Sequence, residues 1–264
     1  MKQHPTLGII GGNGWMGSAL GRAALAGGLV APESLIVTAS RSGSRYDDWP
    51  GVMTAECATL IEQSEVVVLS VRPEQFEALD TPIGDRLVIS LMAGVSLKTL
   101  RRTTQSERIV RAMPNAAAAI GRSWTPWCAT PAVQPNERAR VEALLGTCGG
   151  VEAFDDEAHI DYLTALTGSG PAFPALLAEA LIDHARAQGI AASVAQRAVL
   201  ESLAGSLALM REDESAPGEV VKRFLDYGGV TTEGLNAMIE GGLREAVGDG
   251  VSAAHRAARP DADR

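Results

Sequence analysis

Hydrophobic residues in the first half of the chain occur in short runs, separated by polar stretches with helical spacing. Short apolar runs rich in β-branched residues predict buried strands. The alternation of such runs with helical patterns predicts a parallel sheet with crossover helices. The expected strands are 7–11, 34–39, 65–71, 86–91 and 108–111, with two further short strands at 124–129 and 150–154.

The pattern changes after Asp155, where strand signals stop and apolar residues recur at helical spacing. A glycine loop at 226–230 precedes one final expected helix that carries Leu235, Leu243 and Val251. We therefore expect two domains, an α/β domain over 1–155 and an all-α domain over 156–264. The other expected helices are 156–167, 170–188, 193–211 and 219–225.

A glycine-rich turn follows the first expected strand and opens the first expected helix. The spacing of its glycines is G-x-G-x-x-G, which predicts a Rossmann-type doubly wound sheet that binds a dinucleotide. Bare backbone would approach the pyrophosphate, and the helix N-terminus would favour its charge. The candidate cofactor residues are Gly12, Asn13, Gly14, Trp15, Met16 and Gly17.

The end of the second expected strand indicates which dinucleotide binds. NAD-binding proteins place an acid there for the ribose, whereas this chain has Ser40, Arg41 and Ser42, with Arg45 nearby. A guanidinium matches a 2′-phosphate, so the sequence favours NADPH, with NADH as the weaker alternative. A solvated loop arginine is the competing interpretation. Loops after the next strands, at 90–94 and at Val71, Arg72 and Pro73, are expected along the same sheet edge.

Composition limits the possible partners. The 264 residues carry a net charge of −9 and a pI near 5.0, which argues against binding to nucleic acid. The three cysteines form no disulfide pattern, and the four histidines show no metal-ligand spacing. No apolar run approaches the ~20 residues that span a bilayer, and we recognise no signal peptide. We expect a cytoplasmic protein that binds neither metal nor membrane.

Three further motifs resemble those of pyrroline-5-carboxylate reductases. They are Arg111-Ala112-Met113-Pro114-Asn115, then 167–173 (Thr-Gly-Ser-Gly-Pro-Ala-Phe), and Gly228-Gly229 before a helix. Together with the glycine loop they occur in the family's order, and the resemblance extends over nearly the whole chain. The resemblance implies NADPH-dependent reduction of the cyclic imine 1-pyrroline-5-carboxylate to L-proline. It also implies a helical domain that interlocks two subunits, giving a homodimer or a larger homo-oligomer.

The resemblance also assigns candidate residues to the two substrates of the reaction. Met113, Pro114 and Asn115 would line the nicotinamide end of the cleft. Glu179, Gly228, Gly229 and Thr231 would face the imine. Imine reduction needs a hydroxyl or water at the ring nitrogen, and Thr231 is the candidate catalytic hydroxyl. Its alternative role is the N-cap of the last helix.

The chain departs from the family where Ser-Pro usually precedes the Gly-Gly pair. Here Asp226 and Tyr227 occupy those positions, and Val230 follows the glycines. In the family that serine contacts the substrate carboxylate, so the resemblance makes Asp226 a further candidate substrate-binding residue. A carboxylate at Asp226 would repel a carboxylate substrate by about 1–4 kcal/mol at contact. Three arrangements would avoid this repulsion. In the first, Asp226 turns away and caps the helix; in the second, it is protonated or pairs with a cation such as Arg223. In the third, the substrate has no carboxylate at this point or carries a positive group. A reductase of another imine is thus the first alternative function.

Three other functions compete with that assignment. A β-hydroxyacid dehydrogenase needs a lysine on a C-terminal helix, and only Lys222 follows Lys98. A prephenate-type dehydrogenase needs a histidine in the cofactor domain, and none lies between Pro5 and Ala158. A protein that binds NADPH without turnover is the non-enzymatic alternative.

Overall fold

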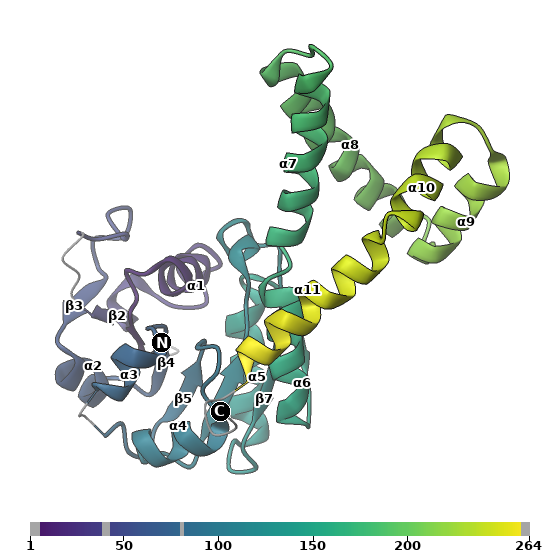
Figure 1. Ribbon diagram of the computed structural model, residues 1–264. Helices are drawn as coiled ribbons and strands as arrows, with labels where there is room; N and C mark the ends of the chain where they lie inside the picture. The colour runs from purple at the N-terminus through teal and green to yellow at the C-terminus, as the bar shows by residue number, and fades with distance from the viewer. Residues whose placement is uncertain (1–5, 39–42, 80–81, 260–264) are drawn as a thin grey trace. The chain divides into compact units, whose positions relative to one another are not determined.

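The computed structural model describes residues 6–38, 43–79 and 82–259, and it divides into two compact units (Figure 1). The first unit comprises Met1–Pro171 together with Ala254–Arg264, and the second comprises Ala172–Ala253.

The first unit is built on one eight-stranded sheet in the order β3-β2-β1-β4-β5-β6-β7-β8. Each of the seven expected strands is present, and no strand end lies more than two residues from its expected position. The strands are β1 (Leu7–Ile10), β2 (Leu35–Thr38), β3 (Met53–Ala55), β4 (Val66–Leu69), β5 (Leu87–Ser90), β6 (Ile109–Ala112), β7 (Ser123–Ala129) and β8 (Gly149–Ala153).

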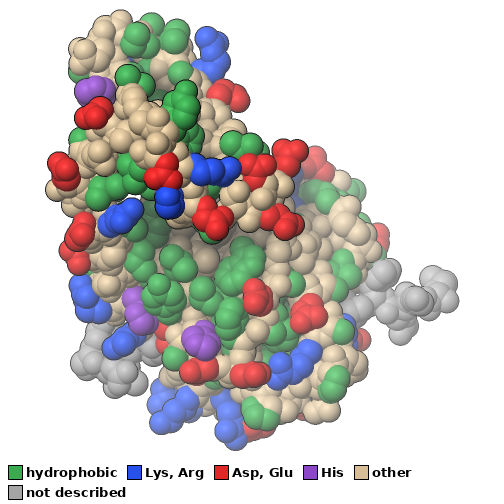
Figure 2. Space-filling model, turned by 90° about the vertical axis from the view of Figure 1, so that its right-hand side faces the viewer, with side chains coloured by type: hydrophobic (Ala, Val, Ile, Leu, Met, Phe, Trp, Pro, Cys, Tyr) green, Lys and Arg blue, Asp and Glu red, His purple; other side chains and the backbone are tan. Residues whose placement is uncertain are grey.

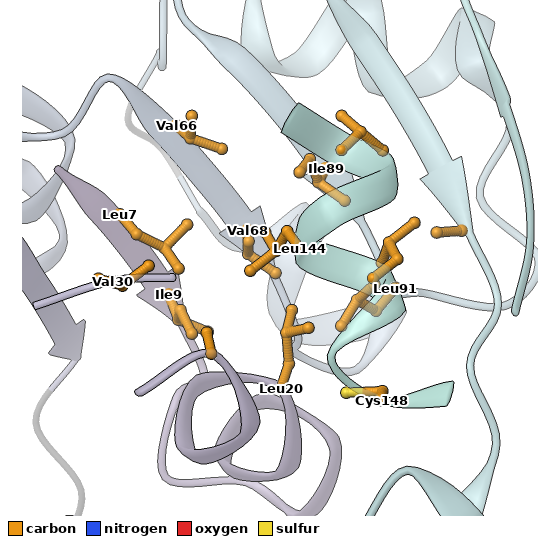
Figure 3. Packing of buried hydrophobic residues seen from close by; sticks show 14 of the residues in the cluster. Leu7, Ile9, Leu20, Val30, Val66, Val68, Ile89, Leu91, Leu144 and Cys148 are labelled. Atoms are coloured by element: carbon orange, nitrogen blue, oxygen red, sulfur yellow. The ribbon is translucent and has the colours of Figure 1, made fainter. Parts of the chain in front are cut away.

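The central strands are buried on both faces, which explains their continuous apolar runs. Leu7 and Ile9 of β1, together with Val66 and Val68 of β4, point to one face (Figure 3). There they meet Leu20 of α1 (Trp15–Ala26) and Leu144 of α5 (Pro135–Gly146). The alternate residues of the same strands enter a second core on the opposite face, which comprises Ile10, Val67, Leu69, Leu60, Leu100 and others.

Two features of the sheet differ from the sequence expectation. β7 runs antiparallel to β6, so the sheet is not wholly parallel. Residues 113–122 link the two strands, and that link is too short for the crossover of a dozen or more residues that parallel strands need. The edge strand β3 was not expected, because three residues that are exposed or half-buried carry almost no hydrophobic signal.

Shorter helices cover the sheet and connect its strands. The remaining ones are α2 (Cys57–Gln63), α3 (Pro73–Glu77), α4 (Leu97–Thr104), α6 (Glu157–Leu163), the 3₁₀ turns η1 (Pro32–Ser34) and η2 (Ala116–Ile120), and the π-helical segment η3 (Thr164–Gly168).

The second unit is entirely helical. Its helices are α7 (Ala172–Ala187), α8 (Ala192–Glu212), α9 (Pro217–Tyr227), α10 (Val230–Glu240) and the first part of α11 (Leu243–Ala258). One long final helix was expected, and that expectation is wrong. The helix breaks at Gly241 and Gly242, where Gly242 has a φ of +82° that most side chains avoid.

The division between the compact units lies later in the chain than the expected boundary at 155/156. Helix α6 packs with the first unit, because Glu157 and Asp161 form ion pairs with Arg111 of β6. Residues 157–168 are therefore helical in conformation but belong by packing to the α/β unit.

Candidate functional site

The turn between β1 and α1 can accommodate little besides glycine. Gly11 has a φ of +84°, and a Cβ added there would lie 2.2 Å from the carbonyl oxygen of Ser70. A Cβ at Gly17 would lie 2.5 Å from the oxygen of Gly11. The backbone must therefore be bare at both positions. The G-x-G-x-x-G spacing identified Gly12, Gly14 and Gly17, but it did not identify Gly11, the left-handed residue of this turn.

The other residues of the turn have different surroundings. Gly14 is the N-cap of α1, and no side chain caps the start of that helix. Its free N–H groups and dipole therefore favour an anion. Met16 packs against the core, whereas Trp15 is 66% exposed and borders a separate hollow beside Arg22 and Trp49. Trp15 was expected to bind cofactor, but it does not line the groove described next.

A groove of about 430 Å³ follows this turn at the carboxyl ends of β1, β2 and β4. The strand order reverses here, because β2 and β3 lie on one side of β1 whereas β4 and β5 lie on the other. Open α/β sheets bind their ligands at such topological switch points. Among the candidate cofactor residues, Asn13, Gly14 and Val71 line the groove. Its full lining is Ile10, Gly11, Asn13, Gly14, Thr38, Glu56, Cys57, Ser70, Val71, Gln75 and Leu79.

Asn13 connects the glycine turn to the end of β2. Its Nδ2 donates to the carbonyl oxygen of Thr38 at 3.1 Å, and its Oδ1 accepts from Arg45 N at 3.0 Å. Arg45 Nε in turn donates to the carbonyl oxygen of Asn13 at 3.1 Å. The structure thus brings the Arg45 side chain to the glycine turn, whereas the sequence analysis placed Arg45 only near the expected cofactor residues.

The remaining cofactor candidates lie beside this groove or outside the described residues. Ser40, Arg41 and Ser42 fall among residues 39–42, which the structure does not describe. Arg72 is the exposed N-cap of α3, and Pro73 is the first residue of that helix. The expectation of a loop over 71–73 is therefore wrong at its end, and only Val71 reaches the groove.

Met113, Pro114 and Asn115 follow β6, and the first two are buried. Asn115 Nδ2 donates to the carbonyl oxygen of Thr167 at 2.9 Å, and Asn115 Oδ1 accepts from Ala117 N at 3.0 Å. A Cβ added at Gly168 would lie 3.3 Å from Met113 Cγ. The two motifs that are most specific in the sequence, 113–115 and 167–173, therefore meet within the first unit.

Directly before this segment, Arg111 is a buried cation with two acidic partners. Its side chain is 1% exposed, and its guanidinium pairs with Glu157 and, at 2.8 Å, with Asp161. Burial lowers the pKa of Arg111, but hydrogen bonds and charge from Asp161 and Glu157 outweigh that effect and raise it overall. Arg111 therefore remains charged. Cys128 lies opposite it on β7, where burial raises the pKa of the thiol to about 12.

Two family models match most of the chain between them. A model described as NADP oxidoreductase, coenzyme F420-dependent, matches residues 6–94. A model described as pyrroline-5-carboxylate reductase dimerisation matches residues 157–260. The second match begins close to the expected domain boundary at 156.

A pyrroline-5-carboxylate reductase of Synechocystis is 32% identical over 258 residues, which cover 95% of this chain and 96% of that protein. The chain belongs to the pyrroline-5-carboxylate reductase family. A pyrroline-5-carboxylate reductase of Thermus thermophilus is 34% identical, with 93% and 94% of the two chains covered.

Solved structures agree with the family assignment. The 1-pyrroline-5-carboxylate reductase of Streptococcus pyogenes is 27% identical, with a TM-score of 0.84 over 96% of this chain and 97% of that one. The pyrroline carboxylate reductase of Plasmodium falciparum, solved with NADP bound, shares the fold at a TM-score of 0.87 and 24% identity, with 97% and 98% covered.

The candidate substrate residues of the family lie in the helical unit. Glu179 is exposed on α7. Gly228 and Gly229 have φ of +81° and +86° and form the turn between α9 and α10. Thr231 is exposed at the second position of α10, whose N-cap is Gly229. The alternative role of Thr231 as the N-cap is therefore wrong, and its hydroxyl is available for another partner.

Asp226 has a cationic partner other than the expected one. Its carboxylate pairs with Lys222, one turn earlier on α9, whereas Arg223 donates to Ser215 Oγ at 3.2 Å. Both side chains of the pair are largely exposed, at 73% for Lys222 and 63% for Asp226. Tyr227 and Val230 beside the glycine turn are 87% and 91% exposed. The departure from the family motif thus places an ion pair and two apolar side chains around this turn.

Proposed function

We propose that this chain reduces 1-pyrroline-5-carboxylate to L-proline with NADPH as the hydride donor. The observation that carries the proposal is the glycine-walled groove at the sheet's switch point, in a chain that also joins Met113 and Asn115 to the segment around Gly168. The relatives from Synechocystis and Thermus are named for this reaction, and the match extends over both chains almost end to end.

The residues around the glycine turn fit a dinucleotide. A Cβ would close the space at Gly11, and the uncapped start of α1 favours a pyrophosphate. Gly12, Gly14 and Gly17 give the turn its shape, while Asn13 fixes it to β2. When bound, the reduced nicotinamide supplies a hydride to the carbon of the C=N bond. Met113, Pro114 and Asn115 would line its ring and exclude water from it.

The preference for NADPH over NADH rests on two arginines. Arg41 follows the second strand in the sequence, and Arg45 lies against the glycine turn through two hydrogen bonds with Asn13. A guanidinium recognises a 2′-phosphate and gains nothing from a ribose hydroxyl of NADH. NADH would therefore serve as the poorer donor.

The imine would bind at the glycine turn of the helical unit. Gly228 and Gly229 leave the N–H groups at the start of α10 open to the substrate carboxylate. The Thr231 hydroxyl would hold the ring nitrogen and its proton, because a protonated iminium accepts hydride far better than a neutral imine. Glu179 is the further candidate that the family motif assigns to the substrate.

Lys222 reduces the repulsion expected between Asp226 and a carboxylate substrate. It places a positive charge beside the Asp226 carboxylate, so the net charge at the turn is less negative, although solvent screens a pair this exposed. We therefore favour the usual substrate of the family over another imine. A cytoplasmic location fits the three free cysteines, because thiols persist in reducing compartments.

The decisive experiment is a steady-state assay of NADPH oxidation with 1-pyrroline-5-carboxylate, with proline identified by mass spectrometry. Turnover, with a higher kcat/KM for NADPH than for NADH, is the expected result. Failure with this substrate but turnover of an uncharged cyclic imine would favour the altered pocket. In that case the double substitution Asp226→Ser with Tyr227→Pro should restore the usual substrate. Binding of NADPH without oxidation across all imines would favour the non-catalytic alternative.

A further inference from the structure

Arg111 is held by one face of one helix. Glu157 and Asp161 are four residues apart on α6, so their carboxylates project to the same side and take different nitrogens of the guanidinium. Asp161 is 13% exposed and Glu157 30% exposed, while the Arg111 side chain is almost fully enclosed. We call these three residues the α6 clamp.

The α6 clamp also reaches the loop that follows β5. Glu157 Oε1, the oxygen that pairs with Arg111, accepts a hydrogen bond from Leu97 N at 2.7 Å. One carboxylate therefore connects strand β6, helix α6 and the start of α4. Those elements border 91–96 and 113–115, the two stretches that follow the neighbouring strands β5 and β6 at the carboxyl edge of the sheet.

Helix α6 passes directly into the π-helical segment that meets Met113 and Asn115. Thr164 Oγ1 donates back to Ile160 O at 2.7 Å, and Thr167 Oγ1 donates to Leu163 O at 2.8 Å. The segment is thus a continuation of α6, and its position follows that of the helix. Asn115 then holds the carbonyl oxygen of Thr167 at 2.9 Å, two residues after Met113.

Stability alone does not account for this arrangement. Replacing a buried ion pair by apolar residues is often neutral or stabilising, because desolvation offsets the attraction. Here two carboxylates share one guanidinium, and Arg111 Nε has no hydrogen-bond partner among the residues that the structure describes. The two ion pairs of Arg111 on β6 with Glu157 and Asp161 on α6 do, however, fix the position of the helix relative to the strand.

We propose that Arg111 is a positioning residue for hydride transfer: through Glu157 and Asp161 it holds 164–170 against Met113 and Asn115. This inference rests on the proposed function, since those two residues are assigned to the nicotinamide. A misplacement of about 1 Å lowers the rate of a reaction by about 100-fold. The α6 clamp would position Met113 and Asn115 without contacting either substrate. We therefore expect its loss to lower kcat and to leave cofactor binding unchanged.

Asp161→Asn and Arg111→Lys test the clamp with the least change in volume. Asparagine keeps an acceptor but removes the charge, and lysine keeps the charge but cannot reach two carboxylates in a forked geometry. We expect kcat to fall at least tenfold while KM for NADPH changes less than twofold. The primary isotope effect with 4-deuterated NADPH should rise, because the hydride step becomes rate-limiting. Arg111→Lys should retain more activity than Arg111→Met.

Arg108→Met is the matched control. Arg108 precedes β6 and pairs with Glu137 of α5, so its loss also removes a partly buried ion pair, but on the side away from α6. It should lower Tm without changing the isotope effect. If Arg108→Met and Asp161→Asn alter kcat equally at matched stability, or if folded Asp161→Asn keeps full kcat, the positioning role is refuted.

A second measurement does not depend on turnover. In Asp161→Asn, hydrogen exchange should rise at 164–170, and the ¹³C-methyl resonance of Met113 should shift, whereas Arg108→Met should alter neither. Unchanged exchange and an unchanged resonance in Asp161→Asn would overturn the inference. If the unmodified protein failed to reduce the imine but Asp161→Asn still showed these changes, the proposed function would fail and the structural clamp would stand.

Discussion

At the scale of single residues, Asn13 connects the glycine turn to the neighbouring strand. Its Nδ2 donates to the carbonyl oxygen of Thr38, its Oδ1 accepts from Arg45 N, and its carbonyl oxygen accepts from Arg45 Nε. Thr38 Oγ1 also accepts from Gly11 N at 2.9 Å. The end of β2 and the loop after it are therefore tied to the turn that would receive the pyrophosphate.

Arg45 borders the hollow beside Trp15 and not the groove itself, but two hydrogen bonds with Asn13 hold it against the turn that would receive the cofactor. We therefore expect Arg45 to affect cofactor selectivity. A hydrogen bond to a charged group contributes about 1.5–3 kcal/mol, which corresponds to roughly 10–100-fold in affinity. We expect Arg45→Ala to raise KM for NADPH by about tenfold and to change KM for NADH little. Arg41→Ala should act in the same direction. The measurement is KM for both cofactors at saturating imine.

Arg140→Ala is the control for that prediction, because Arg140 forms only an exposed ion pair with Glu65 at 3.2 Å. It should leave both KM values unchanged. An equal rise for NADPH and NADH in Arg45→Ala would show that the residue supports the glycine turn and does not read the 2′-phosphate.

At the scale of elements, the sequence predicted what local patterns encode. The buried strands were found because runs such as Val66 to Leu69 are apolar on both faces. The helix expected over 170–188 is α7, which ends shortly before Gly189, whose φ is +86°. Other features depend on distant partners. The antiparallel direction of β7, the edge strand β3 and the grouping of α6 with the α/β unit follow from tertiary packing.

The candidate site shows the same distinction. The glycine spacing and the Met-Pro-Asn motif are contiguous in the sequence and were recognised from it. The contact of Asn115 with Thr167 joins residues 52 positions apart, and the Arg45 contact with Asn13 joins residues 32 apart. No local pattern identifies such pairs. Lys222 lies four residues before Asp226 on the same helix, so the sequence could have identified this ion pair, but the sequence analysis considered Arg223 as the partner.

The break between α10 and α11 gives a test at this scale. Gly242 has a φ of +82°, and a Cβ added there would meet only Glu245 Oε2, at an ordinary contact distance of 3.9 Å. Gly248 lies in the interior of α11 with nothing within 4 Å of an added Cβ. Gly242→Ala should destabilise the protein by about 1–2 kcal/mol, the cost of left-handed backbone. Gly248→Ala should stabilise it by about 0.5–1 kcal/mol through its helix propensity. Urea unfolding at one fixed protein concentration measures both.

Opposite signs for these two substitutions are the essential result. If Gly242→Ala were neutral, α10 and α11 would be one continuous helix, as the hydrophobic pattern predicted.

At the scale of the molecule, the helical unit lacks a core of its own. Among residues 172–253, only Ala178 and Ala195 are buried. Hydrophobic side chains are exposed on the molecular surface in Figure 2, among charged ones. The exposed apolar residues of this unit include Phe173, Leu176, Leu177, Val194, Leu200, Leu207, Leu209, Phe224, Met238 and Val247.

The helical segment Glu157–Ala187, whose second half lies in this unit, is long and apolar enough to cross a membrane, and 11% of its most apolar stretch is buried. Helices that are buried in soluble proteins share this length and composition. The same residues lie in the region that matches the dimerisation model, so a second copy of the chain is the better occupant of this surface.

We therefore predict a homodimer, or a larger homo-oligomer built from it, through the helical unit. Leu200 and Leu207 are seven residues apart on α8, on one helix face, and are 49% and 57% exposed. Their joint change to glutamate should place charges in the interface and give monomers by sedimentation equilibrium, with a lower Tm that no longer depends on protein concentration. Met53→Glu, at the exposed edge strand β3, is the control and should assemble normally. A monomeric unmodified protein at micromolar concentration would contradict the prediction, and a double variant that assembles normally would place the interface elsewhere.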